Sequence, residues 1–81
     1  MNNEYKERTK ENAIYNYMVM IKNSWTWERL TDQERVAFID TVNFAQTRGI
    51  RGTYEQRWEI LNLMYRTLLN TLGYSPIGWR E

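Results

Sequence analysis

Carboxylates are the residues with which this chain could perform acid–base chemistry, because it contains no histidine and no cysteine. Glu28 with Asp32, and Glu55 with Glu59, are spaced to share one face of a helix. Carboxylate pairs of this kind bind metal ions in helical bundles, but Glu-x-x-His motifs complete those sites. Such a site cannot form without histidine, and arginines lie close to both pairs in the sequence. We therefore expect these carboxylates to form surface ion pairs.

The other motifs of catalysis are missing as well. Ser24 and Ser75 are the only serines, and neither has a histidine to activate it. Thiol nucleophiles, thiolate zinc sites and iron–sulfur clusters all require cysteine. The stretch 49–52, which contains two glycines, is too short for a nucleotide-binding fingerprint. We expect a protein with no catalytic residues, no metal site and no cofactor.

The length and charge of the chain are those of one small domain over residues 1–81, with 42% hydrophobic residues and a formal net charge of +1. This near-neutral charge argues against general binding to nucleic-acid phosphates. No apolar run approaches the ~20 residues of a membrane span. The N-terminal residues lack the apolar core of a signal peptide. We expect a cytoplasmic location and no membrane association.

Hydrophobic periodicity predicts the fold class. Over three segments, apolar side chains recur at intervals of three and four residues, as in amphipathic helices. No segment shows the alternation of a β-strand. The sequence therefore predicts an all-α fold, a compact three-helix bundle with helices at about 3–22, 32–48 and 54–72. A short aromatic tail, residues 73–81, follows the third helix.

Local signals mark the ends of the second and third helices. Thr31 with Glu34, and Thr53 with Gln56, have the spacing of capping boxes and predict where these helices begin. A glycine directly after each helix is placed to close it in the left-handed conformation.

The same periodicity selects candidate core residues. In the second helix we expect burial of Val36, Ile39, Val42 and either Phe38 or Ala45. In the third helix the expected stripe is Trp58, Leu61, Met64 or Tyr65, Leu68 and Leu72, widened by Ile60 and Leu69. Residues 1–12 are highly charged, and Glu4–Arg8 and Glu7–Lys10 are spaced as helical ion pairs. We expect this helix start to fray or to project beyond the core.

Aromatic residues and arginine are unusually frequent. The chain has four Trp and six Tyr, and eight of its eleven basic residues are arginine. Each ring buries about 150–250 Å² when covered, and aliphatic residues already supply most positions of a small core. Some rings are therefore expected at the surface, where Trp, Tyr and Arg form interface hot spots. The alternative is that the rings fill the core and cap the bundle ends.

Protein binding is the function class that this surplus favours. The candidate partner is a larger protein, and self-association through the same aromatic face is an alternative. The candidate partner-binding residues are Trp27, Arg51, Tyr54, Arg57 and Trp79.

A second function class is nucleic-acid binding. The second helix, the glycine turn and the third helix have the order of a helix-turn-helix motif. The start of the third helix carries residue types that contact bases and phosphates, namely Arg51, Thr53, Tyr54, Gln56 and Arg57. Glutamates on the same helix and the low net charge make this the less favoured hypothesis.

The last third of the chain resembles short proteins of bacteriophages and mobile elements. The stretches that carry the resemblance are YEQRWEIL at 54–61 and LGYSPIGWRE at 72–81. This resemblance implies a location in a bacterial host cell, without implying a particular activity. Small phage proteins often block or redirect a host protein, and inhibitors of defence nucleases of the anti-CRISPR kind are one instance.

Overall fold

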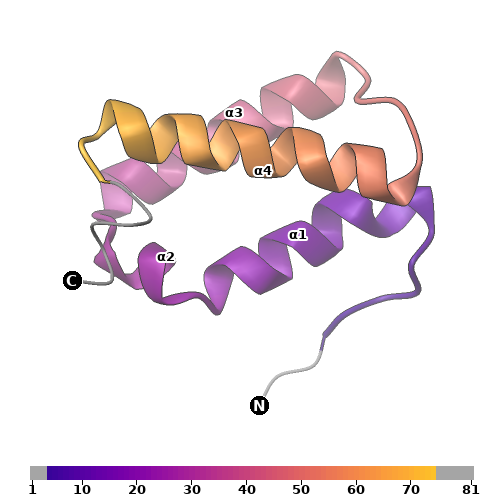
Figure 1. The fold of residues 1–81 in the computed structure, drawn as a ribbon, viewed down its shortest axis with the longest axis horizontal. Coiled ribbons are helices and arrows are strands. Elements are labelled where there is room, and N and C mark those ends of the chain that lie inside the picture. Colours follow the sequence, from indigo (N-terminus) through magenta and orange to yellow (C-terminus); the bar gives the residue numbers. More distant parts are fainter. Residues whose placement is uncertain (1–3, 75–81) are drawn as a thin grey trace.

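The computed structural model describes residues 4–74, and this part of the chain contains helices but no strand (Figure 1). The elements are a single 3₁₀ turn η1 (Lys10–Asn12), then α1 (Ala13–Lys22), α2 (Trp25–Arg29), α3 (Asp32–Thr47) and α4 (Tyr54–Thr71). The prediction of an all-α helical bundle is confirmed. Its three expected helices correspond to α1, α3 and α4, and α2 is an additional short helix within a segment expected to be a connection.

Helix α4 is the element on which the other long helices pack. In Figure 1, α1 runs beside α4 in the same direction, and α3 crosses behind it in the opposite direction. The molecule measures 35 × 31 × 22 Å, so its shortest dimension is about two helix diameters. A body this thin has one layer of core side chains, and each helix buries only a narrow face.

Aromatic rings from α2, α3 and α4 fill the centre of the core. The ring centroids of Phe38 and Tyr65 lie 5.0 Å apart in an edge-to-face arrangement. Trp27 packs against both rings, at 6.2 and 6.4 Å. The buried cluster as a whole consists of Tyr17, Ile21, Trp27, Leu30, Phe38, Val42, Leu61, Tyr65 and Leu69.

The buried faces of α3 and α4 differ in part from the predicted ones. On α3, Phe38 and Val42 are buried, whereas Val36 is 54% exposed. Position 36 lies about 200° around the helix from position 38, so both cannot face one thin core layer. On α4, Ile60 and Leu72 are 39% and 36% exposed, because the core face is centred on Leu61, Tyr65 and Leu69.

The predicted helix start at residue 3 is wrong. Among the described residues, 4–9 are not helical, and the first helical turn begins at Lys10. The side chain of Asn16, which is 1% exposed, bonds to both backbone polar groups of Lys6. A buried amide requires hydrogen-bond partners, and residue 6 cannot serve this amide while its own backbone groups form a helix.

The helix starts confirm the sequence signals. Thr31 Oγ1 accepts from the Glu34 amide at 3.1 Å, and the Glu34 carboxylate accepts from the Thr31 amide at 2.9 Å. Thr53 and Gln56 form the same reciprocal pair at 3.2 and 2.9 Å. Both capping boxes are therefore present. Helix α2 begins with a cap as well, since Ser24 Oγ accepts from the Trp27 amide.

The turn between α3 and α4 depends on two glycines with positive φ, Gly49 at 84° and Gly52 at 115°. A Cβ atom on Gly52 would lie 2.5 Å from Gln56 Oε1, whereas one on Gly49 would meet nothing within 4 Å. The capping side chain of Gln56 therefore occupies the space that a side chain at residue 52 would need.

Replacing each of these glycines by alanine should distinguish the cost of a left-handed backbone from the cost of a steric clash with the Gln56 side chain. We expect Gly49→Ala to lower the free energy of unfolding by about 1 kcal/mol, the cost of a left-handed alanine. Gly52→Ala should cost about 3 kcal/mol, because its backbone conformation is less accessible and the capping box must move. Urea unfolding of both variants measures this difference, and equal costs would contradict the role given to Gln56.

Candidate functional site

Trp27, predicted to be a partner-binding residue, is a core residue. Its side chain is 8% exposed and packs between Phe38 and Tyr65. The guanidinium of Arg35 lies 6.0 Å from the ring centroid, and Arg35 Nε donates to the Trp27 carbonyl at 3.0 Å. An anchor for a partner must be accessible, so the prediction of an exposed Trp27 is corrected. This residue attaches α2 to α3 and α4.

Tyr54 is also buried, at 8% exposure. Its ring stacks on Trp58 with centroids 5.7 Å apart, and its hydroxyl accepts a hydrogen bond from Asn16 Nδ2 at 3.3 Å. The guanidinium of Arg8 covers the outer part of the ring, 4.4 Å from the centroid. Tyr54 is therefore a structural residue rather than the exposed anchor that the sequence predicted.

The remaining predicted residues differ in their placement. Arg57 Nε donates to the Gly52 carbonyl at 2.9 Å, and its Nη1 donates to the Lys10 carbonyl at 3.3 Å. Arg57 therefore ties η1 to the start of α4. Arg51 is exposed and lines a shallow surface depression beside Ile60. Trp79 lies outside the described residues, so its predicted role stays a prediction.

Exposed rings do occur, as the sequence predicted, but they are different rings. Within residues 4–74 the exposed aromatic side chains are Tyr5, Tyr15, Trp25 and Phe44, at 49, 39, 47 and 60%. A basic side chain lies over the face of three of them, which is the geometry of a cation–π contact. These pairs are Lys6 over Tyr15, Arg29 over Trp25 and Arg48 over Phe44, at 4.4, 4.5 and 4.6 Å from the ring centroid.

The spacing of two of these pairs is visible in the sequence. Trp25 with Arg29 and Phe44 with Arg48 are four residues apart on a helix, the spacing at which side chains meet. Trp25 and Trp27 are two positions apart, so within one helix they point to nearly opposite sides. An arginine lies over each ring, Arg29 over Trp25 and Arg35 at 6.0 Å from the Trp27 centroid, so a contact with arginine alone does not separate the exposed tryptophan from the buried one.

The start of α4 does not present the surface that a DNA-reading helix needs. The side chains of Thr53 and Gln56 are bonded within the capping box, and Arg57 is bonded to two carbonyl oxygens. Tyr54 is buried. Of the residues expected to contact bases, Arg51 alone is exposed with its charge not engaged in an ion pair within residues 4–74. This arrangement does not favour the DNA-binding hypothesis.

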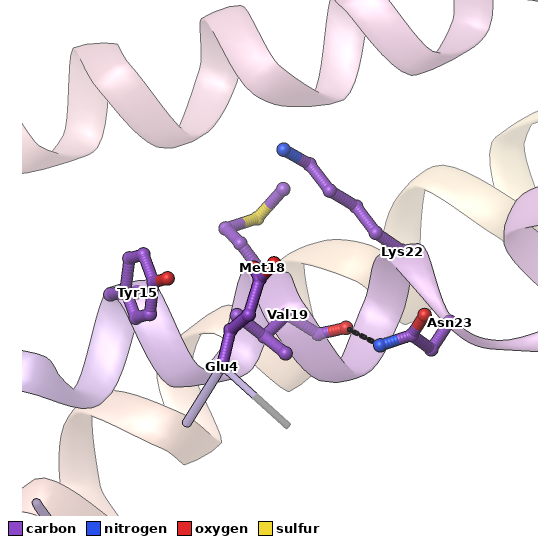
Figure 2. Close-up of a pocket in the computed structure, with 6 residues that line it drawn as sticks. All are labelled: Glu4, Tyr15, Met18, Val19, Lys22 and Asn23. Carbon is purple, nitrogen blue, oxygen red and sulfur yellow. Dashed lines mark hydrogen bonds between the residues drawn. The ribbon is translucent and has the colours of Figure 1, made fainter. Parts of the chain in front are cut away.

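The hollows on the surface are shallow. Figure 2 shows one on the outer side of α1, where Tyr15, Met18 and Lys22 project from the same side of the helix and Glu4 lies across it. Its volume is about 230 Å³, below the range of about 300–1,000 Å³ that is usual for small-molecule sites. The cleft beside Arg8 and Tyr54, at about 330 Å³, and the open depression beside Arg51, at about 720 Å³, lie within that range. Residues 4–74 contain no group of three potential metal ligands. None of the helices described is long and apolar enough to cross a membrane.

The fold raises the pKa values of two buried tyrosines. Burial raises the pKa of Tyr17, whose hydroxyl donates to Asn62 Oδ1 at 3.1 Å, and the nearby Tyr65 raises it further. Burial also raises the pKa of Tyr65, whose hydroxyl shares a hydrogen bond of 3.0 Å with Thr26. Both hydroxyl groups join separate helices and have a structural role.

No family model, no curated protein and no solved structure matches this chain. The resemblance of the C-terminal third to phage proteins therefore stays a prediction. The candidate functional surface is defined by its own residues. We use the term ring–cation surface for three pairs taken together, whose rings lie on three different helices: Tyr15 with Lys6, Trp25 with Arg29, and Phe44 with Arg48.

Truncating the two neighbouring tryptophans should give opposite results. Trp27→Ala should lower the free energy of unfolding by about 3–5 kcal/mol through loss of core packing. This is comparable with the whole stability of about 4–12 kcal/mol expected for a chain of this length. Trp25→Ala should cost less than about 1 kcal/mol, as surface substitutions do. Thermal and urea unfolding measure both, and a Trp27→Ala protein of normal stability would contradict its place in the core.

The buried tyrosines make stability sensitive to alkaline pH. Their pKa values are raised in the folded state, so above about pH 10 the unfolded chain loses these protons first and folding is destabilised. Each group contributes a slope of up to about 1.4 kcal/mol per pH unit, and the full stability is present below pH 10. Urea unfolding from pH 8 to 11.5 should show the decline. The Tyr17→Phe protein should lose about half of the slope, whereas Tyr15→Phe, at an exposed ring, should leave it unchanged.

Proposed function

We propose that this chain is a non-enzymatic protein-binding module that docks on a larger protein through its ring–cation surface. The observation that supports the proposal is that three of the four exposed rings in residues 4–74 lie under a basic side chain. The covered rings of the core already stabilise the fold, so these three are in excess of what folding requires.

A ring under a guanidinium presents two kinds of binding group at one point. The exposed part of the ring offers apolar area, and the arginine N–H groups remain able to donate to a carboxylate. Phe44 is 60% exposed even with Arg48 over its face, so a partner has ring area left to cover. The partner chemistry that fits is an apolar surface bordered by acidic side chains.

The distribution of the pairs favours a large partner. Helix α2, which carries Trp25, and the C-terminal end of α3, near Phe44, lie at opposite ends of the molecule (Figure 1). The longest dimension of the molecule is 35 Å. A protein that contacts both ends must span most of that length, and about 800 Å² on each partner is usual for a stable interface.

The resemblance to phage proteins suggests the kind of partner. We propose a protein of a bacterial host cell that is blocked when the ring–cation surface binds it, within the cytoplasm. An inhibitor of a defence nuclease, of the anti-CRISPR kind, is one instance. Homo-oligomerisation through the same rings is the alternative within this class, and the molar mass of the purified protein in solution separates the two.

The test compares single substitutions at rings with and without a cation. Affinity capture from the bacterial host identifies the partner, and titration of the purified pair gives the dissociation constant. Phe44→Ala and Trp25→Ala should each weaken binding about tenfold or more, as hot-spot residues do. Val36→Ala is the control, because Val36 is similarly exposed, at 54%, without a cation over it.

Equal effects of Phe44→Ala and Val36→Ala would contradict the role of the ring–cation pairs. An electrophoretic mobility shift with random DNA duplex over a salt series tests the nucleic-acid alternative on the same protein. Binding at low salt that weakens steeply with added salt would support that alternative over ours.

A further inference from the structure

The N-terminal segment is held by a side chain that binds main-chain groups. Asn16 Oδ1 accepts from the Lys6 amide at 2.8 Å, and Asn16 Nδ2 donates to the Lys6 carbonyl at 3.0 Å. One residue exchanges both its backbone groups with this amide, as paired residues do between antiparallel strands. Because only backbone atoms are used, Asn16 would hold any residue in the place of Lys6.

The side chains of Lys6 and Arg8 each lie over an aromatic ring. Lys6 Nζ lies 4.4 Å from the Tyr15 ring centroid. The Arg8 guanidinium lies 4.4 Å from the Tyr54 ring centroid and 3.3 Å from the Glu55 carboxylate. Main-chain bonding at one residue, with side-chain recognition at alternate positions, is how proteins bind peptide segments in a strand-like conformation.

The main chain of the segment is held by Asn16 and by Asn12, whose Nδ2 donates to the Glu7 carbonyl at 3.0 Å, whereas its side chains are accessible. Residues 4–8 are all exposed. In the ion pair of Arg8 with Glu55, the side chains are 68% and 71% exposed, and an ion pair this accessible contributes little. The Asn16 amide is buried and needs a main-chain partner, but the structure does not require that this partner be Lys6.

Space is available at both ends of the segment. At the Arg8 end, a cleft of about 330 Å³ is lined by Arg8 itself and by Tyr54, Trp58, Glu55 and Glu59, so that the cleft holds two carboxylates and one guanidinium. Glu59 has no ion-pair partner among residues 4–74. At the other end, Glu4 lines the hollow on α1 that Figure 2 shows.

We propose that the groove floored by Asn16 and Tyr54 binds an arginine-bearing segment of another protein, with a lysine two residues before the arginine. In the structure, residues 4–8 of the chain itself occupy this groove. Binding of the segment from the other protein displaces them. The occupant is basic because the groove offers two aromatic faces and two carboxylates. This surface shares only Tyr15 and Lys6 with the ring–cation surface, so it does not rest on the proposed function.

The test uses the full chain with Arg8→Ala, which frees the cleft without changing a buried residue. The probe is a capped synthetic peptide with the sequence of residues 4–9, EYKERT, and the control peptide has alanine in place of its arginine. Both are titrated into ¹⁵N-labelled protein, and the shifts of the Asn16 side-chain amide and the Trp58 indole are followed. The arginine peptide should bind about fivefold or more tightly, as a cation–π contact with an ion pair predicts.

Further variants make the result specific. Adding Glu55→Gln and Glu59→Gln to the Arg8→Ala chain should remove the preference for the arginine peptide. The unsubstituted chain should show the same order of affinities at higher peptide concentration, because its own segment competes. Equal binding of both peptides, or shifts that do not include Asn16, would overturn the proposal.

A dimer that forms with rising concentration and is lost in the Arg8→Ala chain would also overturn it, since the occupant would then be a second copy. These measurements leave Trp25 and Phe44 intact. A negative result in these measurements therefore does not contradict the proposed function, which is tested by the variants of Trp25 and Phe44.

Discussion

The buried amide of Asn16 is the interaction on which the N-terminal half of the structure depends. It is the one polar side chain that is buried within residues 4–74, and it bonds to Lys6 twice and to Tyr54 once. Leaving such an amide unbonded in the core costs about 1–3 kcal/mol. This cost holds the first described residues against α1 and α4 in a non-helical conformation, although their charges favour a helix.

The position of Asn16 has consequences along α4. Its bond to the Tyr54 hydroxyl fixes that buried ring where it stacks on Trp58 and is covered by Arg8. Trp58 then presents an edge to Tyr17, 4.9 Å away between centroids. One polar contact thereby sets the arrangement of the aromatic side chains that join α1 to α4. The cleft at the start of α4 is a result of this arrangement.

A thin core explains which residues are left at the surface. Aliphatic side chains were expected to fill the core and aromatic ones to be in excess. The structure reverses part of this assignment: the rings of Trp27 and Tyr54, expected at the surface, are buried, whereas Val36, expected in the core, is 54% exposed. One ring can span a single core layer that would otherwise need two aliphatic side chains. Apolar residues do outnumber the positions in the core, but some of those left at the surface are aliphatic rather than aromatic.

The features that the sequence predicted are those decided within a few residues. The capping box of Thr31 depends only on a partner three positions away, and the helix class of α3 and α4 follows from their periodicity. The failures depend on distant contacts. Residues 4–9 are shaped by an amide ten positions from Lys6, and Trp25 and Trp27 differ only in which side of α2 meets α3 and α4. No local pattern contains that information.

Both candidate surfaces depend on a cation over an aromatic ring, but they differ in whether the chain itself or a partner supplies the cation. On the ring–cation surface, arginines of the chain cover its own exposed rings, which limits the apolar area in contact with water and leaves N–H groups for an acidic partner. In the groove at Asn16, the chain supplies rings and carboxylates, and we propose that another arginine can replace the exposed side chain of Arg8 that now provides the cation. An arginine that bridges two residues of the fold, as Arg57 does, is unsuited to either task because its donors are already used. The number of arginines therefore says less about binding than the atoms to which each guanidinium donates.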